Sequence, residues 1–237
     1  SRPKRVDSIK PKLLLRLKTK KSNLFLFMLL IAICSSSGSD LLEKQEVRLK
    51  NIQQLTFSGE NAEGYFSLDG SMIIYQSHDG DSLCDQIYTM DLSTKETKLV
   101  STGLGVTTCA YFEHPKCENI IYASTHLGGD SCPPKPDYSR GYVWKLYPDY
   151  DIFKSSRDGK ILKQMTDSPG YDAEATVAFD GSKVLYTSIA SGDLEVWSMN
   201  NDGSNKTQLT NRLGYDGGAF FNSKATKIVW RVYHPKT

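Results

Sequence analysis

Residues 54–92 read QLTFSGENAEGYFSLDGSMIIYQSHDGDSLCDQIYTMDL, and the same order of signals returns twice later in the chain. Residues 164–200 read QMTDSPGYDAEATVAFDGSKVLYTSIASGDLEVWSMN. A third copy begins at residues 208–231 with QLTNRLGYDGGAFFNSKATKIVWR. A repeat of about 40 to 50 residues is typical of β-propellers, in which each repeat supplies one blade.

A divergent copy lies between the first two and keeps the same strand pattern. The residues that start the four copies, Thr56, Ser101, Thr166 and Thr210, are separated by 45, 65 and 44 positions. The second copy is therefore longer by about 20 residues, which fall between Thr125 and Tyr147 in the loop expected to join its second and third strands.

Each copy reads as four short strands. Val, Ile, Tyr, Phe and Trp fill the apolar runs, and Asp-Gly pairs at 69, 158, 180 and 202 supply the positive φ angles that tight hairpins need. The alternation along residues 87–90 gives a strand two different faces, as stacked propeller sheets require. We predict an all-β chain, a β-propeller of four-stranded blades over residues 51–237, since a β-sandwich does not explain why the signals recur in one order. The expected blades are 51–100, 101–163, 164–208 and 209–237, the last ending after its second strand.

The first 39 residues have the layout of an export signal. Nine of the 29 Lys and Arg residues lie there beside one acid, Asp7, so the remaining chain has a net charge of −6, which disfavours nucleic acid as a partner. An apolar run over 24–33 is about half as long as a membrane span, and a Ser-rich stretch follows it. Cys34 resembles the lipidated cysteine of a bacterial lipoprotein, although Ile33 departs from that pattern. Soluble secretion and a lipid anchor both stay open, and residues 40–50 are expected to be a linker.

The repeat resembles the TolB-like repeat, a WD40-like propeller repeat of exported bacterial proteins. The resemblance rests on Gln54-Leu55-Thr56, Phe66-Ser67-Leu68-Asp69-Gly70, Ile87-Tyr88-Thr89-Met90-Asp91 and Asn200-Asn201-Asp202-Gly203-Ser204, and it covers residue 51 to the end. It implies a binding propeller of about six blades located in the periplasm, on the outer membrane or outside the cell. The chain is then expected to be a piece of the protein, without the α/β domain that precedes the propeller in TolB.

Four cysteines in the repeat region are disulfide candidates in an exported protein. Cys84, Cys109 and Cys132 are expected on one face of the propeller, and we predict that Cys109 pairs with Cys84 or with Cys132. Cys117 falls in a hairpin towards the other face. The spacing lacks the close cysteine pairs of zinc ribbons, so a zinc site is not expected.

Two loops resemble each other and are expected side by side, residues 77–84 and the insertion 125–137. They form a candidate binding surface for a protein or peptide, or alternatively a disulfide-pinned loop that covers one end of the propeller. The candidate polar contacts are His78, Asp79, Asp81, His126 and Asp130, and the candidate stacking residues are Tyr138, Tyr142 and Trp144.

Three acidic residues enter first strands, which line the central channel of a propeller. Asp172, Glu174 and Asp216 are candidates for an acidic ring able to hold Ca²⁺ or a basic peptide. The alternative is that each Asp caps its own turn. No other cofactor is expected.

The sequence lacks a Gly-x-Ser-x-Gly elbow, a phosphate-binding glycine loop and a His-Glu-x-x-His helix. We therefore expect a non-catalytic propeller that binds protein or peptide partners, with contact to a membrane only through its signal or a lipid anchor. Two alternatives are the propeller of a larger prolyl-oligopeptidase-type hydrolase and a carbohydrate-binding or polymer-binding surface protein.

Overall fold

The computed structural model describes residues 47–79, 84–141 and 143–234. The chain divides into a unit that ends at Gln54 and a unit from Leu55 onward. Residues 47–54 contain no helix or strand, and every strand among the described residues belongs to the second unit. The expected export signal, including Cys34, lies outside the described residues.

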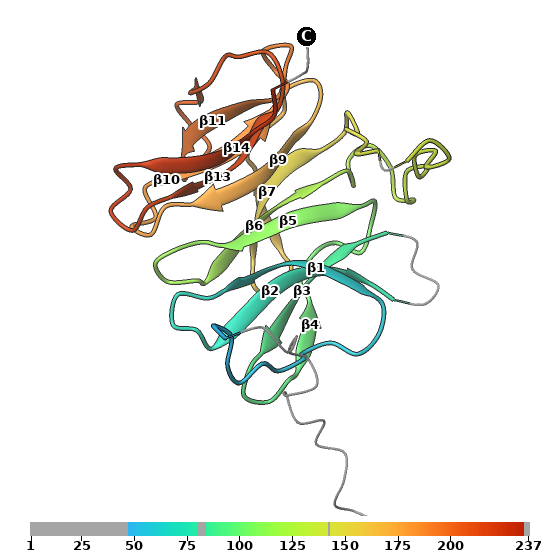
Figure 1. Cartoon of the computed structure of the whole chain (residues 1–237), viewed down its shortest axis with the longest axis vertical. Coiled ribbons are helices and arrows are strands. Elements are labelled where there is room, and N and C mark those ends of the chain that lie inside the picture. Colours follow the sequence, from blue (N-terminus) through green and yellow to red (C-terminus); the bar gives the residue numbers. More distant parts are fainter. Residues whose placement is uncertain (1–46, 80–83, 142, 235–237) are drawn as a thin grey trace, which may run out of the picture. The chain divides into compact units, whose positions relative to one another are not determined.

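The second unit is a series of antiparallel sheets that follow one another in chain order, from β1 in cyan to β14 in red (Figure 1). The first sheet contains β1 Glu60–Phe66, β2 Met72–His78, β3 Gln86–Asp91 and β4 Thr97–Leu99. The second contains β5 Thr107–Phe112, β6 Asn119–Ser124, β7 Asp151–Ser156 and β8 Ile161–Gln164. The third contains β9 Asp172–Val177, β10 Lys183–Ser188, β11 Glu195–Asn200 and β12 Thr207–Gln208. The fourth contains β13 Asp216–Phe221 and β14 Ile228–Val232.

This architecture confirms the predicted propeller fold. Each four-stranded sheet is a meander in which every strand pairs with the next, as in a propeller blade. The first strands of successive blades are neighbours, with β5 beside β1 and β9, and β13 beside β9. β6 ends at Ser124 and β7 begins at Asp151, so the extra residues of the second blade lie in the loop where the sequence places them.

The hydrophobic core consists of layers between facing blades. Ile120 packs in the layer between the first and second blades, whereas Ile121, the next residue of β6, packs between the second and third. Both side chains are fully buried. Consecutive strand residues point to opposite faces of the sheet. Because an inner blade packs against a neighbouring blade on each side, both of its faces need apolar side chains. Leu185, Val196 and Ala219 form the corresponding layer between the third and fourth blades.

The residues that start the second, third and fourth copies each accept an equivalent hydrogen bond. The hydroxyl oxygens of Ser101, Thr166 and Thr210 accept the N–H of Ile87, Ile152 and Val196, each at 2.9 Å. The hydroxyl thus fastens the chain, as it leaves one blade, to the third strand of that blade. The recurrence of Ser or Thr at these positions follows from the need for a small side chain with an acceptor oxygen.

Replacement of Thr166 by Val removes this acceptor and keeps the shape of the side chain. Thr166 is buried, so the N–H of Ile152 is left without a partner and the free energy of unfolding should fall by about 1 to 3 kcal/mol. Thr166→Ser keeps the hydroxyl and should retain most of the stability. Urea denaturation followed by tryptophan fluorescence measures both variants, and equal losses would contradict the role of the hydroxyl.

Two equivalent turn glycines differ in their surroundings. Gly70 and Gly181 both follow an Asp between the first and second strands of a blade, with φ of 70° and 73°. A Cβ on Gly181 would lie 2.4 Å from the carbonyl oxygen of His114 in the preceding blade, whereas a Cβ on Gly70 would meet nothing within 4 Å.

Substitution of each glycine by Ala separates backbone strain from blade contact. Gly70→Ala should lower the free energy of unfolding by about 1 kcal/mol, the usual cost of a left-handed alanine. Gly181→Ala should lower it by roughly 3 kcal/mol, because the added methyl also pushes the His114 backbone away. Thermal or urea unfolding compares the two, and a Gly181→Ala protein as stable as Gly70→Ala would show that the blades do not approach closely here.

Candidate functional site

Every first strand is interrupted by a β-bulge at the same position. The pairing with the second strand shifts between Ala62 and Tyr65, Thr108 and Tyr111, Ala173 and Thr176, and Gly217 and Phe220. One residue in each bulge has a left-handed backbone, and these four residues, called the bulge ring below, are Glu63 (φ 52°), Cys109 (φ 51°), Glu174 (φ 56°) and Gly218 (φ 59°). Such conformations are costly for residues other than Gly, so the surrounding blade structure must hold them.

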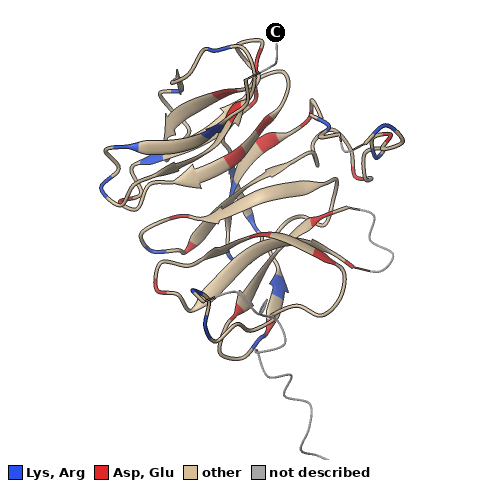
Figure 2. Ribbon diagram, in the orientation of Figure 1, with Lys and Arg blue, Asp and Glu red and all other residues tan. Residues whose placement is uncertain are grey.

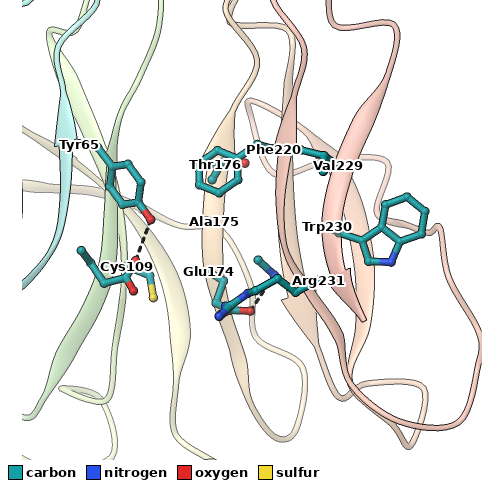
Figure 3. A pocket seen from close by; sticks show the side chains of 11 residues that line it. Tyr65, Cys109, Glu174, Ala175, Thr176, Phe220, Val229, Trp230 and Arg231 are labelled. Atoms are coloured by element: carbon teal, nitrogen blue, oxygen red, sulfur yellow. Dashed lines mark hydrogen bonds and ion pairs between the residues drawn. The ribbon is translucent and has the colours of Figure 1, made fainter. Parts of the chain in front are cut away.

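All four residues of the bulge ring line one cavity of about 360 Å³, called the inner cavity below (Figure 3). The rest of its wall is largely apolar and comes from the first strands and from β14. These residues are Tyr65, Ala175, Thr176, Phe220, Val229, Trp230 and Arg231. Since the bulges turn equivalent positions towards the same space, the repeated fold itself assembles this lining.

Glu174 is the most connected residue of the bulge ring. Its carboxylate accepts hydrogen bonds from the Tyr215 hydroxyl at 2.7 Å, the Thr187 hydroxyl at 2.7 Å and the Gly218 N–H at 2.9 Å. It also pairs with Arg231 at 2.8 Å. Figure 3 shows this ion pair between Glu174 and Arg231, and Figure 2 shows that acidic and basic residues both occur on the strands of the chain. The carboxylate therefore joins the third blade to the fourth, and burial together with Glu174 raises the pKa of the Tyr215 hydroxyl.

The remaining part of the bulge ring combines a carboxylate with a thiol. Glu63 is exposed and accepts a hydrogen bond from the Tyr65 hydroxyl at 2.7 Å. Cys109 is not in a disulfide. Burial, reinforced by the charges of Glu174 and Glu63, raises the pKa of its thiol to about 12. The thiol stays protonated at neutral pH and is therefore a poor nucleophile.

A second cavity of about 450 Å³, called the insertion cavity below, shares Glu63, Cys109, Glu174 and Arg231 with the inner cavity. Its wall on one side comes from the insertion of the second blade. Those residues are Pro136, Tyr138, Val143, Trp144, Lys145 and Tyr147. On the other side lie polar residues from the ends of strands, including Gln76, Asp85, Thr107 and Thr108.

The insertion is held in place by covalent and aromatic contacts. A disulfide joins Cys132 to Cys84, which precedes β3 in the first blade. The Trp144 ring packs edge-on against Tyr171 and Tyr215, with ring centroids 5.7 and 5.5 Å apart. The two loops that resemble each other in sequence thus lie side by side, as predicted, and a disulfide joins them.

The predicted partner of the disulfide is wrong in one respect. Cys109 was expected to pair with Cys84 or Cys132, but these two cysteines pair with each other. Cys109 lies in the bulge of β5 and borders both cavities, whereas Cys84 and Cys132 lie in loops. Cys117 is buried in the hairpin between β5 and β6, where its sulfur accepts the N–H of Leu68 at 3.4 Å.

The structure separates the predicted stacking residues from the predicted polar contacts. Tyr138 and Trp144 line the insertion cavity, but neither cavity is lined by His78, Asp79, His126 or Asp130. His78 binds the Asp85 carboxylate at 2.5 Å, and Asp79 accepts the Ser58 hydroxyl at 2.7 Å. The His126 ring packs 4.4 Å from Phe153, and burial lowers its pKa, which favours the neutral form. Asp130 is exposed. Asp81 and Tyr142 lie outside the described residues.

The three candidates for the acidic ring are divided in the same way. Glu174 lines both cavities, but Asp172 and Asp216 line neither and are buried. The bulge at Glu174 breaks the two-residue alternation of the strand, so the side chains of Asp172 and Glu174 do not point in the same direction. Asp172 accepts a hydrogen bond from Ser168, and Asp216 accepts one from the Trp230 indole at 2.8 Å.

The bulge ring itself was missed at Glu63 and Cys109, although the sequence carries a signal for it. In every copy the bulge residue is followed by a small residue and then by Tyr, Thr or Phe. The small residues are Gly64, Ala110, Ala175 and Ala219. Alignment of the copies on these small residues places Glu63, Cys109 and Glu174 at equivalent positions.

Among residues 47–79, 84–141 and 143–234, no group of three or more His, Cys, Asp or Glu side chains is arranged to hold a metal ion. Within the same ranges, no helix has the length and apolar character needed to cross a bilayer.

A half-buried acid of the second blade makes stability depend on pH. Asp151 begins β7 and accepts hydrogen bonds from Thr166 at 3.2 Å and Gln164 at 2.9 Å. Burial raises its pKa to about 6, and the charges of Asp172 and Asp167 add to the shift. Because the folded pKa exceeds the unfolded one, this contribution to stability is complete below pH 4 and is lost as the pH rises through 6.

Asp151→Asn should remove that loss. Relative to the variant, the original protein should lose about 1 kcal/mol of unfolding free energy between pH 4 and pH 7, less than the full shift implies because solvent screens part of the carboxylate. Urea denaturation of both proteins at the two pH values measures the difference. A difference that is constant with pH, or that grows in the opposite direction, would contradict the raised pKa.

No protein-family model and no curated protein matches this sequence. The structure is similar to a putative TolB from Agrobacterium tumefaciens, with 18% identity, a TM-score of 0.55 and coverage of 72% of this chain and 53% of the other. TolB from Acinetobacter baumannii gives 17% identity, a TM-score of 0.56 and coverage of 75% and 38%. A chain of a nidogen/laminin complex gives 12% identity, a TM-score of 0.54 and coverage of 74% and 57%. The chain therefore has a TolB-like β-propeller fold and spans between about two fifths and three fifths of the length of these structures.

Proposed function

We propose that this chain belongs to an exported, non-catalytic binding protein whose inner cavity receives a protein or peptide partner. The observation that carries the proposal is the bulge ring, in which four equivalent left-handed positions line one cavity. Strained backbone positions gather at functional sites, and here three of the four hold side chains larger than glycine. Apolar side chains beside carboxylates suit a peptide with both apolar and basic residues.

The composition of the inner cavity supports a partner with its own apolar side chains. Val229 of β14 pairs with Phe220 of β13, and both side chains belong to the cavity wall. An apolar cavity wall beside charged residues such as Glu63 and Arg231 is typical of binding sites. The protonated thiol of Cys109 argues against a nucleophilic reaction there.

Export is part of the same proposal. Residues 1–39 have the charge and apolar pattern of a signal, and the Cys84–Cys132 disulfide suits an oxidising compartment such as the periplasm or the cell exterior. A lipid anchor on Cys34 and soluble secretion are both compatible with this placement.

A phage-displayed library of random peptides, selected on the immobilised protein, tests the binding function. We expect enriched peptides with apolar and basic residues, and we expect Val229→Asp to weaken them at least tenfold in fluorescence titrations. Leu213→Asp is the matched control, because Leu213 is 81% exposed and lies outside both cavities. A library without enriched peptides, or equal weakening by the two substitutions, would refute the proposal.

The competing function is that of a propeller attached to a hydrolase domain. The coding sequence that follows Thr237 distinguishes the two. Two to three further repeats followed by a stop codon would support the binding propeller. A Gly-x-Ser-x-Gly segment would instead support the hydrolase and contradict the proposed function.

A further inference from the structure

The insertion cavity differs in chemistry from the inner cavity. Aromatic side chains of the insertion border it, with Tyr138 51% exposed and Trp144 43% exposed. Tyr147 also belongs to this wall, and its hydroxyl is fixed to the carbonyl oxygen of Pro134 at 3.0 Å. The disulfide at Cys132 ties the insertion down, so these rings form a prepared surface.

The opposite wall of the insertion cavity presents hydroxyl and amide groups. The Thr108 hydroxyl donates to the Gln76 amide oxygen at 2.8 Å, and the Thr107 hydroxyl donates to the carbonyl oxygen of Asp85 at 3.1 Å. A hydroxyl that donates its hydrogen still has lone pairs with which to accept. The wall therefore offers acceptors whose positions are already set by internal hydrogen bonds.

The wall of the insertion cavity holds three carboxylates and two basic side chains, so most of its charge is compensated. Glu174 is paired with Arg231 at 2.8 Å. Asp85 accepts the Gln76 amide at 2.7 Å and binds His78 at 2.5 Å. The other two charged residues of the wall are of opposite sign: Glu63 accepts the Tyr65 hydroxyl, and the Lys145 ammonium lies 5.0 Å from the centre of the Tyr147 ring. A strongly charged ligand such as a phosphate would find no matching excess of charge.

We infer that the insertion cavity binds a neutral saccharide. A sugar ring has C–H faces that pack on aromatic rings and hydroxyls that both donate and accept hydrogen bonds, which matches the two walls. The volume of about 450 Å³ is within the usual range for small-molecule sites. The two cavities share four residues, but the aromatic rings of the insertion line only the insertion cavity. A substitution of Tyr138 therefore tests this site without changing the wall of the proposed peptide site.

An array of neutral, acidic and basic glycans, probed with the whole protein, tests the inference. We expect neutral oligosaccharides to bind, and isothermal titration with the best of them should show at least a tenfold loss of affinity for Tyr138→Ala. Tyr138→Phe keeps the ring and should retain most of the affinity. Tyr233→Ala is the matched control, because Tyr233 is exposed and lies outside both cavities.

Three results would overturn the inference: no glycan bound, charged glycans bound in preference to neutral ones, or binding that survives Tyr138→Ala. Circular dichroism of Tyr138→Ala confirms that a loss of affinity does not come from unfolding. Peptide binding in the same variant should be unchanged, which distinguishes this site from the inner cavity.

Discussion

The left-handed bulge in each first strand is the constraint on which the candidate site depends. Without it, residues of β1, β5, β9 and β13 would alternate between two faces along the whole strand. The extra residue makes the strand bend and re-aims the side chains that follow. Since the four bulges occupy the same position, they bring Glu63, Cys109 and Glu174 to one cavity.

The blades can hold such strained positions because each is packed against its neighbours. Apolar layers on both sides of the second and third blades leave little freedom for the first strands to relax. Polar links reinforce the layers: Lys154 binds Glu113 at 2.9 Å within the second blade and the carbonyl oxygen of Asn201 at 2.7 Å in the third. Strain of about 1 kcal/mol or more at each non-glycine bulge residue is small beside this packing.

The fold could be predicted from sequence because it follows from repeated local signals. Thr166 and its equivalents recur since each hydroxyl makes the same hydrogen bond, and the Asp-Gly turns recur since hairpins need positive φ. The site was only partly predictable. Tyr138, Trp144 and Glu174 were candidates from the sequence and line the cavities, but Cys109 was expected in a disulfide and Asp172 was a candidate for the channel. Both errors have one cause: a bulge changes where side chains point, and a pattern of period two cannot show that.

Gly218 lies next to the ion pair that Arg231 of the fourth blade forms with Glu174 of the third. A Cβ at this position would lie 2.8 Å from the Arg231 guanidinium, so a larger residue would shift Arg231 from its present place beside Glu174. The N–H of Gly218 also donates to the same carboxylate. At the other three positions a side chain takes up that space and forms the cavity wall. The left-handed bulge therefore supplies a lining side chain in three blades. In the fourth blade the bulge residue is glycine, and Arg231 compensates the charge of Glu174, the buried carboxylate of the lining.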